Sequence, residues 1–576
     1  AQPLATRTEL TVDLFPREQR AEVGATQRLE NRSSQAIDTL HLVFAPGVSV
    51  KELEVTGARP GKVDPVHGYR AYVFGPPLEP GASATLRYAV ELRHRGFANR
   101  EGLFPVRENG TFLEWYHLEP SFGYDYGREL TDAEARRRNG LPPREAPPAR
   151  EAPGVASVSI FGSGGGTEYS ATISTDADQV AVAPGELVSQ WSQGGRAYFR
   201  YETARPLPYY AVLSGRWAEA RDRWGSVDIV VYYHPTHGEH VGRMLQAVRE
   251  TLEYGTSRFG PFPFSRVAIL EMPRTLGGAA SALPGVILYG EDAGFTSRIR
   301  EGDIDLPFYI TAHEVGHHWW GFQLVPADAR GSGVLREALP QYTSLMVMKH
   351  HFGRDRVRRF LRYEMDRYRV RRGGGETPLA VSGQSYIHYQ KGAVAMFALQ
   401  ERLGEEKVNE ALRGLLREAL EGSPPFPTTL DLMRHFRGVT PDSLLGFLED
   451  TFDRIVLYDN RITTAEATPL ADGRYALRVV VQARKMEADS TGVETDVPMD
   501  ELMDLVVYGA STARGGEPPI LHEGMFRLTN GESVLEMEVE GTPDQVVLDP
   551  FYTVVDRTPR DNERSVVLQQ TQARRP

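Results

Sequence analysis

The chain has 576 residues, a formal net charge of −12, a pI near 5.8 and no cysteine. Its length requires several domains, each with its own core. The acidic charge excludes the electrostatic footprint of a nucleic-acid-binding protein, and the lack of cysteine excludes disulfides and thiol chemistry. No apolar run approaches the length of about eighteen residues that a membrane span needs. The chain begins without Met, at Ala1-Gln2, so we expect a removed leader or an excised soluble part, and an extracytoplasmic location.

The first 220 residues predict an antiparallel β domain. Apolar residues alternate with polar ones at Leu10, Val12 and Leu14, and the same period of two recurs over residues 40–44 and 86–92. Frequent Gly and Pro turns between these runs favour antiparallel sheet. Residues 131–154 are rich in Arg, Pro and Ala, which predicts an exposed loop with a short helix at its start; a basic docking segment is the alternative.

Two further domains are expected, over residues 221–457 and 458–576. The first contains a strand at 227–233, a helix with apolar residues at helical spacing from Val241 to Leu252, a strand at 267–272, and then helices to about Phe452. In the second, strands return with turns of the Asp-Gly and Asn-Gly type, which is typical of a β-sandwich. The strands expected there cover residues 475–481, 505–508, 534–539 and 546–548.

Residues 313–317 read His-Glu-Val-Gly-His and form the most informative motif of the chain. Residues four apart in a helix share one face, so two imidazoles at this spacing can bind one tetrahedral metal ion while the glutamate reaches its open position. The flanks are apolar and aromatic, as in a buried helix. The pattern predicts zinc binding by His313 and His317, with Glu314 as general base. Two core histidines beside a surface glutamate are the alternative.

A third metal ligand is predicted at Glu337, separated from His317 by nineteen residues. Pro340 fits a helix only in the first turn, so a new helix is expected to begin near Glu337 and to continue to His351. The first turn of that helix can present Glu337 to the metal. Two histidines and one glutamate leave a fourth position for water, which is typical of a catalytic site that holds one zinc ion.

These residues resemble a known family. The run HEVGHHWWG, followed by LREALPQY, is similar to the HExxH-xW-G and WLNEGFAEY blocks of the aminopeptidase N family of gluzincin metallopeptidases. The motif HEVAHQWWGHQVVPAD, from a bacterial branch linked to permeases of ATP-driven transporters, is closer still, and here it reads HEVGHHWWGFQLVPAD. The family usually has eighteen residues before the glutamate. Nineteen is the thermolysin spacing, but Gln341 stands where thermolysin-like enzymes carry Asp.

The resemblance implies a multidomain α+β fold. In that fold, a thermolysin-like, mainly helical catalytic domain (221–457) lies between the N-terminal antiparallel β domain (1–220) and the C-terminal β-sandwich (458–576). The similarity is specific over about residues 226–400. For the two flanking domains it depends on domain order alone.

Residues 386–393 (YIHYQKGA) resemble the Tyr-Glu-Lys-Gly segment of this family, whose tyrosine hydrogen-bonds the tetrahedral intermediate. The resemblance implies that Tyr389 stabilises the oxyanion. A phenol suits this role because it donates a hydrogen bond without bringing a full charge into the site. The alternative is an ordinary tyrosine before the helix expected over residues 392–403. Tyr386 and His388 are further candidates for the lining of the pocket.

One block of the family is replaced in this chain. Aminopeptidases of the family carry a GxMEN segment on an edge strand, and its glutamate binds the α-amino group of the substrate. Here Ala280, Ser281 and Ala282 occupy the positions of Met, Glu and Asn, and they form the candidate substrate-binding segment. An N-terminal ammonium then lacks a counter-charge, and an unpaired buried charge is costly. Glu271 and Glu291 are possible substitutes, but both lie out of register.

We therefore expect a zinc-dependent metallopeptidase that acts on peptides or proteins, from the N-terminus or internally. The zinc would lower the pKa of its bound water toward about 7 and polarise the scissile carbonyl. Glu314 would transfer the proton to the leaving amine, and Tyr389 would hold the oxyanion. The alternative is a low-activity or non-catalytic accessory module of a membrane transporter complex, with a permease as partner. Hydrolysis of a lipid epoxide, as in a bifunctional member of the family, has no supporting residue.

Overall fold

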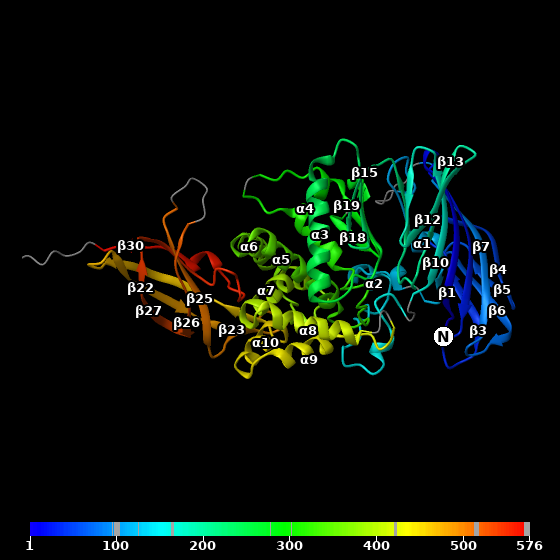
Figure 1. The fold of residues 1–576 in the computed structure, drawn as a ribbon. Helices are drawn as coiled ribbons and strands as arrows, with labels where there is room; N and C mark the ends of the chain where they lie inside the picture. The colour runs from blue at the N-terminus through cyan, green and yellow to red at the C-terminus, as the bar shows by residue number, and fades with distance from the viewer. Residues whose placement is uncertain are drawn as a thin grey trace, which may run out of the picture. The chain divides into compact units, whose positions relative to one another are not determined.

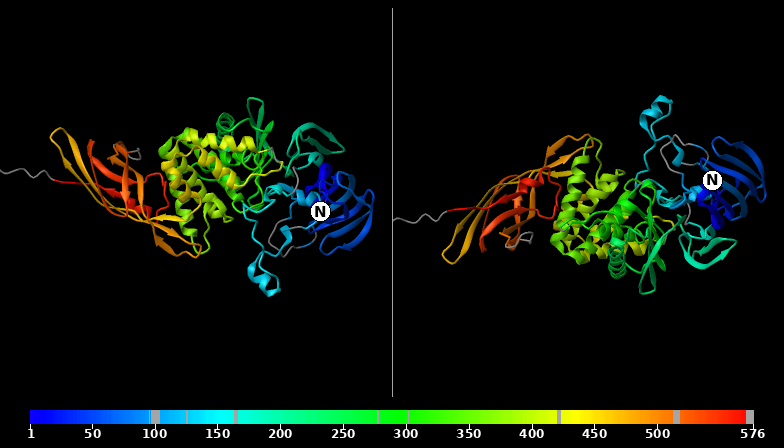
Figure 2. Two further views of the ribbon diagram at one scale, coloured as in Figure 1. Left: turned by 90° about the horizontal axis from the view of Figure 1, so that it is seen from below. Right: turned by 90° about the horizontal axis from the view of Figure 1, so that it is seen from above.

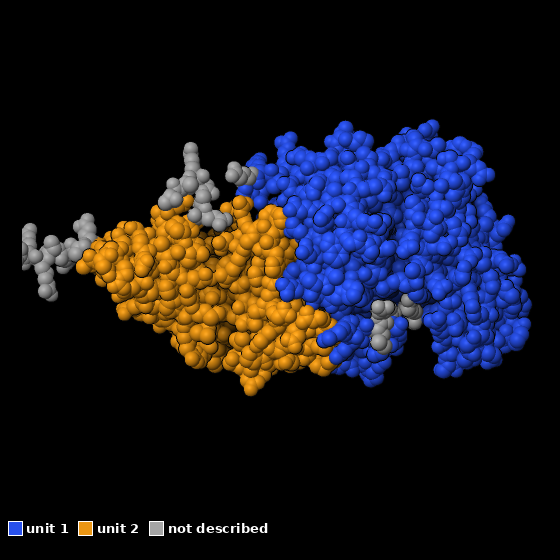
Figure 3. All heavy atoms as spheres, in the orientation of Figure 1, with its two compact units in different colours: residues 1–329, 416–428 blue, residues 330–415, 429–576 orange. Residues whose placement is uncertain are grey.

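The structure of the protein is a computed structural model that describes residues 1–94, 96, 104–124, 126–162, 166–276, 278–300, 302–419, 423–511 and 518–569. The chain forms two compact units (Figure 3), residues 1–329 with 416–428, and residues 330–415 with 429–576. Several sheets and helices are present, with a β domain at the N-terminus and a sheet region at the C-terminus, which confirms a multidomain protein of mixed α and β content. None of the helices in the described ranges is long and apolar enough to cross a membrane.

A seven-stranded sheet begins the first unit, and alternation of apolar residues explains its strands. In β1 the predicted Leu10, Val12 and Leu14 are buried, while the residues between them are partly or fully exposed. The pairings are antiparallel as expected, except that β1 pairs with β10 in parallel. A parallel pair needs a long crossover, and here about 150 residues connect the two strands. In spatial order the strands are β12 (Glu186–Gln193), β13 (Arg196–Glu202), β10 (Glu168–Asp176), β1 (Leu4–Phe15), β2 (Arg20–Glu30), β7 (Ser83–Arg93) and β4 (Val48–Val55) (Figure 1).

Two smaller sheets complete the N-terminal β domain. Side chains of the seven-stranded sheet share one core with the predicted Leu40 and Leu42 of β3, both fully buried. The excursion at residues 131–154 is almost wholly exposed and begins with the short helix α2, as predicted. The four-stranded sheet has the order β5 (Ala58–Asp64), β6 (Tyr69–Leu78), β3 (Ile37–Val43) and β9 (Ser121–Phe122); the three-stranded sheet has the order β11 (Val180–Val182), β14 (Ala211–Gly215) and β8 (Thr111–Glu114); the short helices are α1 (Trp115–Leu118) and α2 (Ala133–Arg138).

A five-stranded sheet and two helices complete the first unit. The three central strands are parallel, and the edge strands β15 and β18 are antiparallel to their neighbours. Helix α3 packs against both the sheet and α4. The predicted strands at 227–233 and 267–272 and the predicted helix from Val241 are confirmed. The elements are β15 (Ala218–Trp224), β16 (Val227–Tyr233), β17 (Arg266–Met272), β19 (Val286–Gly290), β18 (Ala280–Leu283), α3 (Val241–Arg258) and α4 (Leu306–Gly316).

The second unit combines helices with the C-terminal sheets. The helices predicted over 392–403 and up to Phe452 are confirmed, as is the helix after Glu337. The helices are α5 (Leu339–Phe352), α6 (Arg354–Arg371), α7 (Gly392–Leu403), α8 (Glu405–Glu418), which runs past the boundary of the unit, α9 (Thr429–Val439) and α10 (Leu445–Phe452).

Two four-stranded sheets of the C-terminal region share a single hydrophobic core. All four strands predicted there are confirmed. Figure 2 shows these orange and red strands gathered beside the yellow-green helices of the same unit. One sheet is β27 (Gly531–Glu540), β22 (Arg474–Ala483), β21 (Arg461–Pro469) and β30 (Val567–Leu568); the other is β26 (Ile520–Thr529), β25 (Asp500–Gly509), β28 (Pro543–Leu548) and β29 (Glu563–Ser565); a third, small sheet is β20 (Val456–Tyr458), β23 (Lys485–Ala488) and β24 (Glu494–Asp496).

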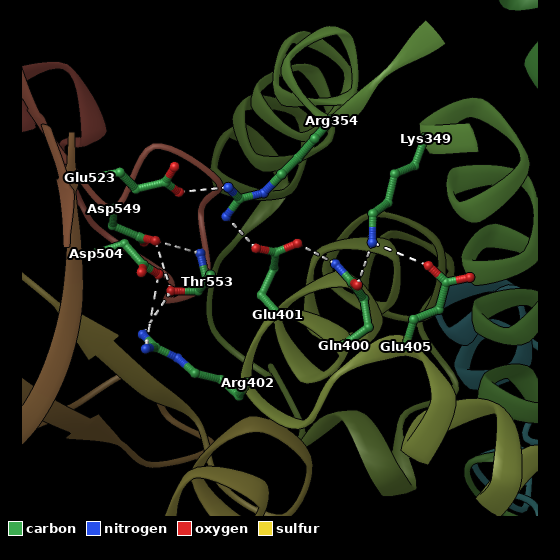
Figure 4. A network of polar contacts seen from close by, with 10 residues as sticks. All are labelled: Lys349, Arg354, Gln400, Glu401, Arg402, Glu405, Asp504, Glu523, Asp549 and Thr553. Atoms are coloured by element: carbon green, nitrogen blue, oxygen red, sulfur yellow. Dashed lines mark hydrogen bonds and ion pairs between the residues drawn. The ribbon is translucent and has the colours of Figure 1, made fainter. Parts of the chain in front are cut away.

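A polar network ties the C-terminal ends of α5 and α7 to each other and to the sheets (Figure 4). Lys349 of α5 donates to the Gln400 side chain of α7 at 2.9 Å, and Arg402 reaches the Thr553 hydroxyl at 3.2 Å. At the opposite end, the Gln341 side chain of α5 donates to the Tyr389 carbonyl, just before α7, at 3.3 Å. The two helices therefore run side by side in the same direction, so the turns at their N-terminal ends are neighbours.

Candidate metal centre

Helix α4 presents the predicted histidines because its local sequence fixes both of its ends. The Asp305 carboxylate accepts a hydrogen bond from the Phe308 amide at 3.0 Å, and Pro307 lies in the first turn, where it costs no hydrogen bond. The helix ends at Gly316, and His317 follows with helical backbone angles. His313 and His317 therefore still lie one turn apart on one face, and the buried helix predicted here is confirmed.

The two imidazoles point their Nε2 atoms at each other, 3.1 Å apart. His317 Nδ1 lies 3.2 Å from the Trp320 carbonyl oxygen, which only accepts, so Nδ1 of His317 carries the proton and its Nε2 lone pair faces His313. Such a hydrogen bond on the far nitrogen is what orients most metal-binding histidines. Tetrahedral zinc at about 2.0–2.1 Å from each nitrogen needs nitrogens about 3.3–3.4 Å apart. The observed pair meets that requirement closely.

Glu314 lies in the same turn and is only 6% exposed. Burial raises the pKa of Tyr289 on β19, and the negative charge of Glu314 raises it further. The carboxylate of the predicted general base is therefore near the five-stranded sheet.

Glu337 lies on a π-turn, η7 (Val334–Ala338), directly before α5. The Leu339 amide donates to the Val334 carbonyl five residues back, which widens the helix at this point. Pro340 lies in the first turn of α5, as predicted. Glu337 is 3% exposed, and one of its oxygens accepts a hydrogen bond from Arg336 Nε at 2.9 Å.

The structure brings the three predicted ligands together. One potential ligand atom each from His313, His317 and Glu337 lies within 4.8 Å of the other two. Two imidazole nitrogens and a carboxylate oxygen form a donor set that suits zinc, and the facing Nε2 atoms fit its geometry. This buried group can hold a metal ion.

Tyr389 lies on a second π-turn, η9 (Ile387–Lys391), which packs against η7. The Gly392 amide donates to the Ile387 carbonyl, again five residues back. The tyrosine is partly exposed, whereas Gln390 and Lys391 beside it are buried. Rare π-turns occur often at functional sites, and here the predicted oxyanion donor and the third candidate ligand each occupy one.

His388 and Tyr386, the two other candidates for the lining of the pocket, have neighbours within the same unit. The His388 ring packs against Gly333, where an added methyl carbon would lie 2.4 Å from Nδ1. Burial lowers the pKa of His388, while Glu337 acts to raise it. Tyr386 stacks on Tyr368 with ring centroids 6.0 Å apart. His388 therefore lies near the candidate ligand Glu337, whereas Tyr386 belongs to the packing of α6.

Ala280, Ser281 and Ala282 lie on the edge strand β18, which contacts α4. Their small side chains leave this edge without a carboxylate. Glu271 lies on β17 rather than on this edge strand, and its oxygens contact the His234 amide and His237 Nδ1, each at 2.5 Å. Burial raises the pKa of Glu271, and the nearby Glu291 raises it further.

Sequence reasoning missed His318, which connects α4 to the β18–β19 turn. Its Nδ1 donates to the Val315 carbonyl at 3.0 Å, and its Nε2 accepts from the Gly285 amide at 3.1 Å. Burial between the rings of Phe262, Phe264 and Phe322 lowers the pKa of this imidazole to about 4, so it is neutral. Only the aromatic richness around residues 262–264 hinted at such a pocket.

Neither a scan against models of protein families nor a search of curated proteins finds a match for this chain. The assignment of a function therefore depends on the residues and the geometry described above.

Proposed function

We propose that the protein is a zinc-dependent metallopeptidase. One observation carries the proposal: His313, His317 and Glu337 form a buried group with ligand atoms within 4.8 Å of one another. Glu314, a residue of the same helical turn as His313, supplies a carboxylate beside this group. Structural zinc sites use four protein ligands, whereas three leave a position for water.

A bound zinc ion supplies Lewis acidity, which makes water a nucleophile at neutral pH and polarises the scissile carbonyl. Glu314 accepts the proton of the attacking water and delivers it to the leaving amine. Tyr389 donates a hydrogen bond to the oxygen that gains negative charge. The Trp320 carbonyl holds the His317 ring in the tautomer that offers Nε2.

The resemblance to the aminopeptidase N family supports the finer assignment of the fold. We assign residues 221–457 to a thermolysin-like catalytic domain and residues 458–576 to a β-sandwich. The parallel helices α5 and α7 and the shared core of the two C-terminal sheets agree with this assignment.

The test of the proposal combines metal analysis with one substitution. We expect one equivalent of zinc per chain, and we expect Glu314→Gln to retain zinc while losing peptide hydrolysis by at least about a hundredfold. Glu253→Gln, on the exposed face of α3, is the matched control and should leave hydrolysis unchanged. Absence of zinc, or full activity of Glu314→Gln, would refute the proposal.

The edge strand β18 determines which peptides are cut. Since Ala280, Ser281 and Ala282 offer no anchor for an ammonium group, we propose cleavage that does not require a free N-terminus. A peptide library with free and acetylated N-termini, with Glu314→Gln as the blank, tests this. Cleavage of free N-termini alone would show that another group binds the amine.

A second candidate function is an accessory module of an extracytoplasmic membrane transporter complex with little or no turnover. The lack of a carboxylate on β18 favours this second function, because in the aminopeptidase N family that carboxylate binds the α-amino group of the substrate. Co-purification of a permease, together with no cleavage of the peptide library, would support this function over a peptidase.

A further inference from the structure

Lys391 is a buried cation on the same π-turn as Tyr389. Its side chain is only 4% exposed, whereas Tyr389, two residues earlier, is partly exposed. The turn η9 packs against both α6 and η7. Lys391 and Tyr389 therefore leave the turn in different directions, one into the protein interior and one toward its surface.

Glu376 is the counter-charge of Lys391. Its Oε1 lies 3.8 Å from Lys391 Nζ and accepts a hydrogen bond from the Tyr368 hydroxyl. Its Oε2 lies 2.8 Å from Arg372 Nε. The ammonium also lies 5.8 Å from the centre of the Tyr368 ring. Tyr368 lies in the last turn of α6 and Arg372 directly follows that helix, so this cluster connects η9 to the end of α6.

Lys391 and Glu376 differ in the number of charged partners that each has. Within the described part of the chain, Glu376 is the one carboxylate within ion-pair distance of Lys391, while Glu376 also has Arg372. Loss of Lys391 would therefore leave Glu376 with a guanidinium partner, and the fold should tolerate it. Loss of Glu376 would instead leave the Lys391 ammonium buried without a counter-charge.

The charge of Lys391 does not serve stability. Burial lowers the pKa of Lys391 from 10.5 to about 8. The positive charge of Arg372 also lowers this pKa, whereas the negative charge of Glu376 raises it. The folded protein therefore holds this proton less tightly than the unfolded chain does, so the charged side chain weakens the fold at neutral pH. A buried group that costs stability is a candidate for a functional role.

The remaining surroundings of Lys391 are a small cavity and the groups that line it. The cavity has a volume of about 30 Å³, and its wall includes Val394, Asp450 and Tyr458. Asp450 forms an ion pair with Lys485 at 2.5 Å. Burial and nearby carboxylates raise the pKa of Tyr458, so its hydroxyl stays neutral. Neither residue therefore supplies a counter-charge to Lys391. The cavity provides space for a longer cation at position 391.

We propose that Lys391 is a positioning residue for catalysis: paired with Glu376, it fixes the buried side of η9 and so sets the direction of Tyr389. The inference rests on the proposed role of Tyr389 in peptide hydrolysis. A π-turn closes its hydrogen bond over one residue more than an α-helix does, and we expect this rare, wider geometry to need support from tertiary contacts. The ion pair supplies that support on the side opposite to the tyrosine.

The experiment compares Lys391→Met with Lys391→Arg. Methionine matches the length of lysine without its charge, and we expect it to lower kcat about tenfold, with KM within about twofold and zinc content unchanged, since loss of a whole oxyanion donor costs about 10²–10³. Its thermal midpoint should not fall. Arginine keeps the charge and should restore most of the loss. Lys407→Met, at an exposed lysine of α8, is the control and should leave kcat unchanged.

Two further measurements separate this inference from the peptidase proposal. Fluorotyrosine at position 389 reports the environment of the ring by ¹⁹F resonance, and Lys391→Met should shift or broaden this signal even in a protein without activity. In an active enzyme, kcat should fall on the alkaline side as Lys391 loses its proton, and Lys391→Arg should move that limb to higher pH. An unchanged ¹⁹F signal in Lys391→Met would overturn the inference whatever the activity. An unchanged kcat would overturn it in the active enzyme, as would failure of Lys391→Arg to rescue.

Discussion

The start of α7 meets the turn η7 closely at Gly392, and filling the space there should disturb the site without unfolding the protein. Gly392 is the first residue of α7, and a methyl carbon built on it would lie 2.7 Å from the Cβ of Ala338, the last residue of η7. Carbon atoms in contact prefer about 3.5–4.0 Å. Gly392→Ala must therefore push the turn carrying Tyr389 and the turn carrying Glu337 apart by about 1 Å.

The expected magnitudes follow from that displacement. Overpacking a core contact costs about 1–3 kcal/mol, and the higher helix propensity of alanine returns about 1 kcal/mol. The free energy of unfolding should then fall by about 0–2 kcal/mol. A misplacement of 1 Å in a catalytic site can cost about a hundredfold in rate, so kcat/KM should fall about 10- to 100-fold. Urea unfolding and peptide hydrolysis measure the two quantities on the same preparation.

A compensating substitution makes the reasoning refutable. Ala338→Gly removes the opposing methyl group, so the double variant Gly392→Ala/Ala338→Gly should regain most of the lost activity, even though glycine lowers helix stability by about 1 kcal/mol. Metal analysis checks that all variants bind zinc equally. Full activity of Gly392→Ala, or a folded, zinc-loaded double variant without recovery, would show that this contact does not set the geometry of the site.

Three other predictions concern single substitutions. Glu337→Gln should weaken zinc binding at least tenfold, measured by competition with a chelator, while the chain stays folded; unchanged affinity would remove Glu337 from the ligand set. Burial raises the pKa of Glu119 from 4.5 to about 7, so its contribution to stability is complete below pH 4.5 and is lost as the pH rises through 7. In Glu119→Gln the hydrogen bonds that Gln27 and Tyr210 donate to Oε2 can persist. Between pH 5 and 8 the free energy of unfolding of the variant, measured in urea, should therefore rise relative to wild type by up to about 3 kcal/mol. A difference in unfolding free energy that does not change with pH would contradict the raised pKa. Asp305→Ala should cost about 1–2 kcal/mol by loss of the α4 cap, and Asp305→Asn, which can still cap, should recover part of it.

The sequence determined the local elements and the candidate metal ligands, because both follow from short-range patterns. Alternation at Leu10, Val12 and Leu14 predicted β1, and helical spacing from Val241 predicted α3. The four-residue spacing of His313 and His317 already places both imidazoles on one face of a helix. Pro340 placed the start of a helix beside Glu337, so the third ligand was also predictable, although the π-turn around it was not.

Only the tertiary structure decided the contacts that hold the site in place. Three contacts join groups whose approach depends on how the chain turns or packs. They are the Trp320 carbonyl with His317, the hydrogen bond that the Gly285 amide donates to His318, and the pair of Lys391 with Glu376. The same holds for the parallel pairing of β1 with β10, and for the contact of Glu271 with His237. The physical reason is that periodicity reports which face of an element is buried, whereas the partner of a buried polar group is set by chain crossings and packing that no local pattern encodes.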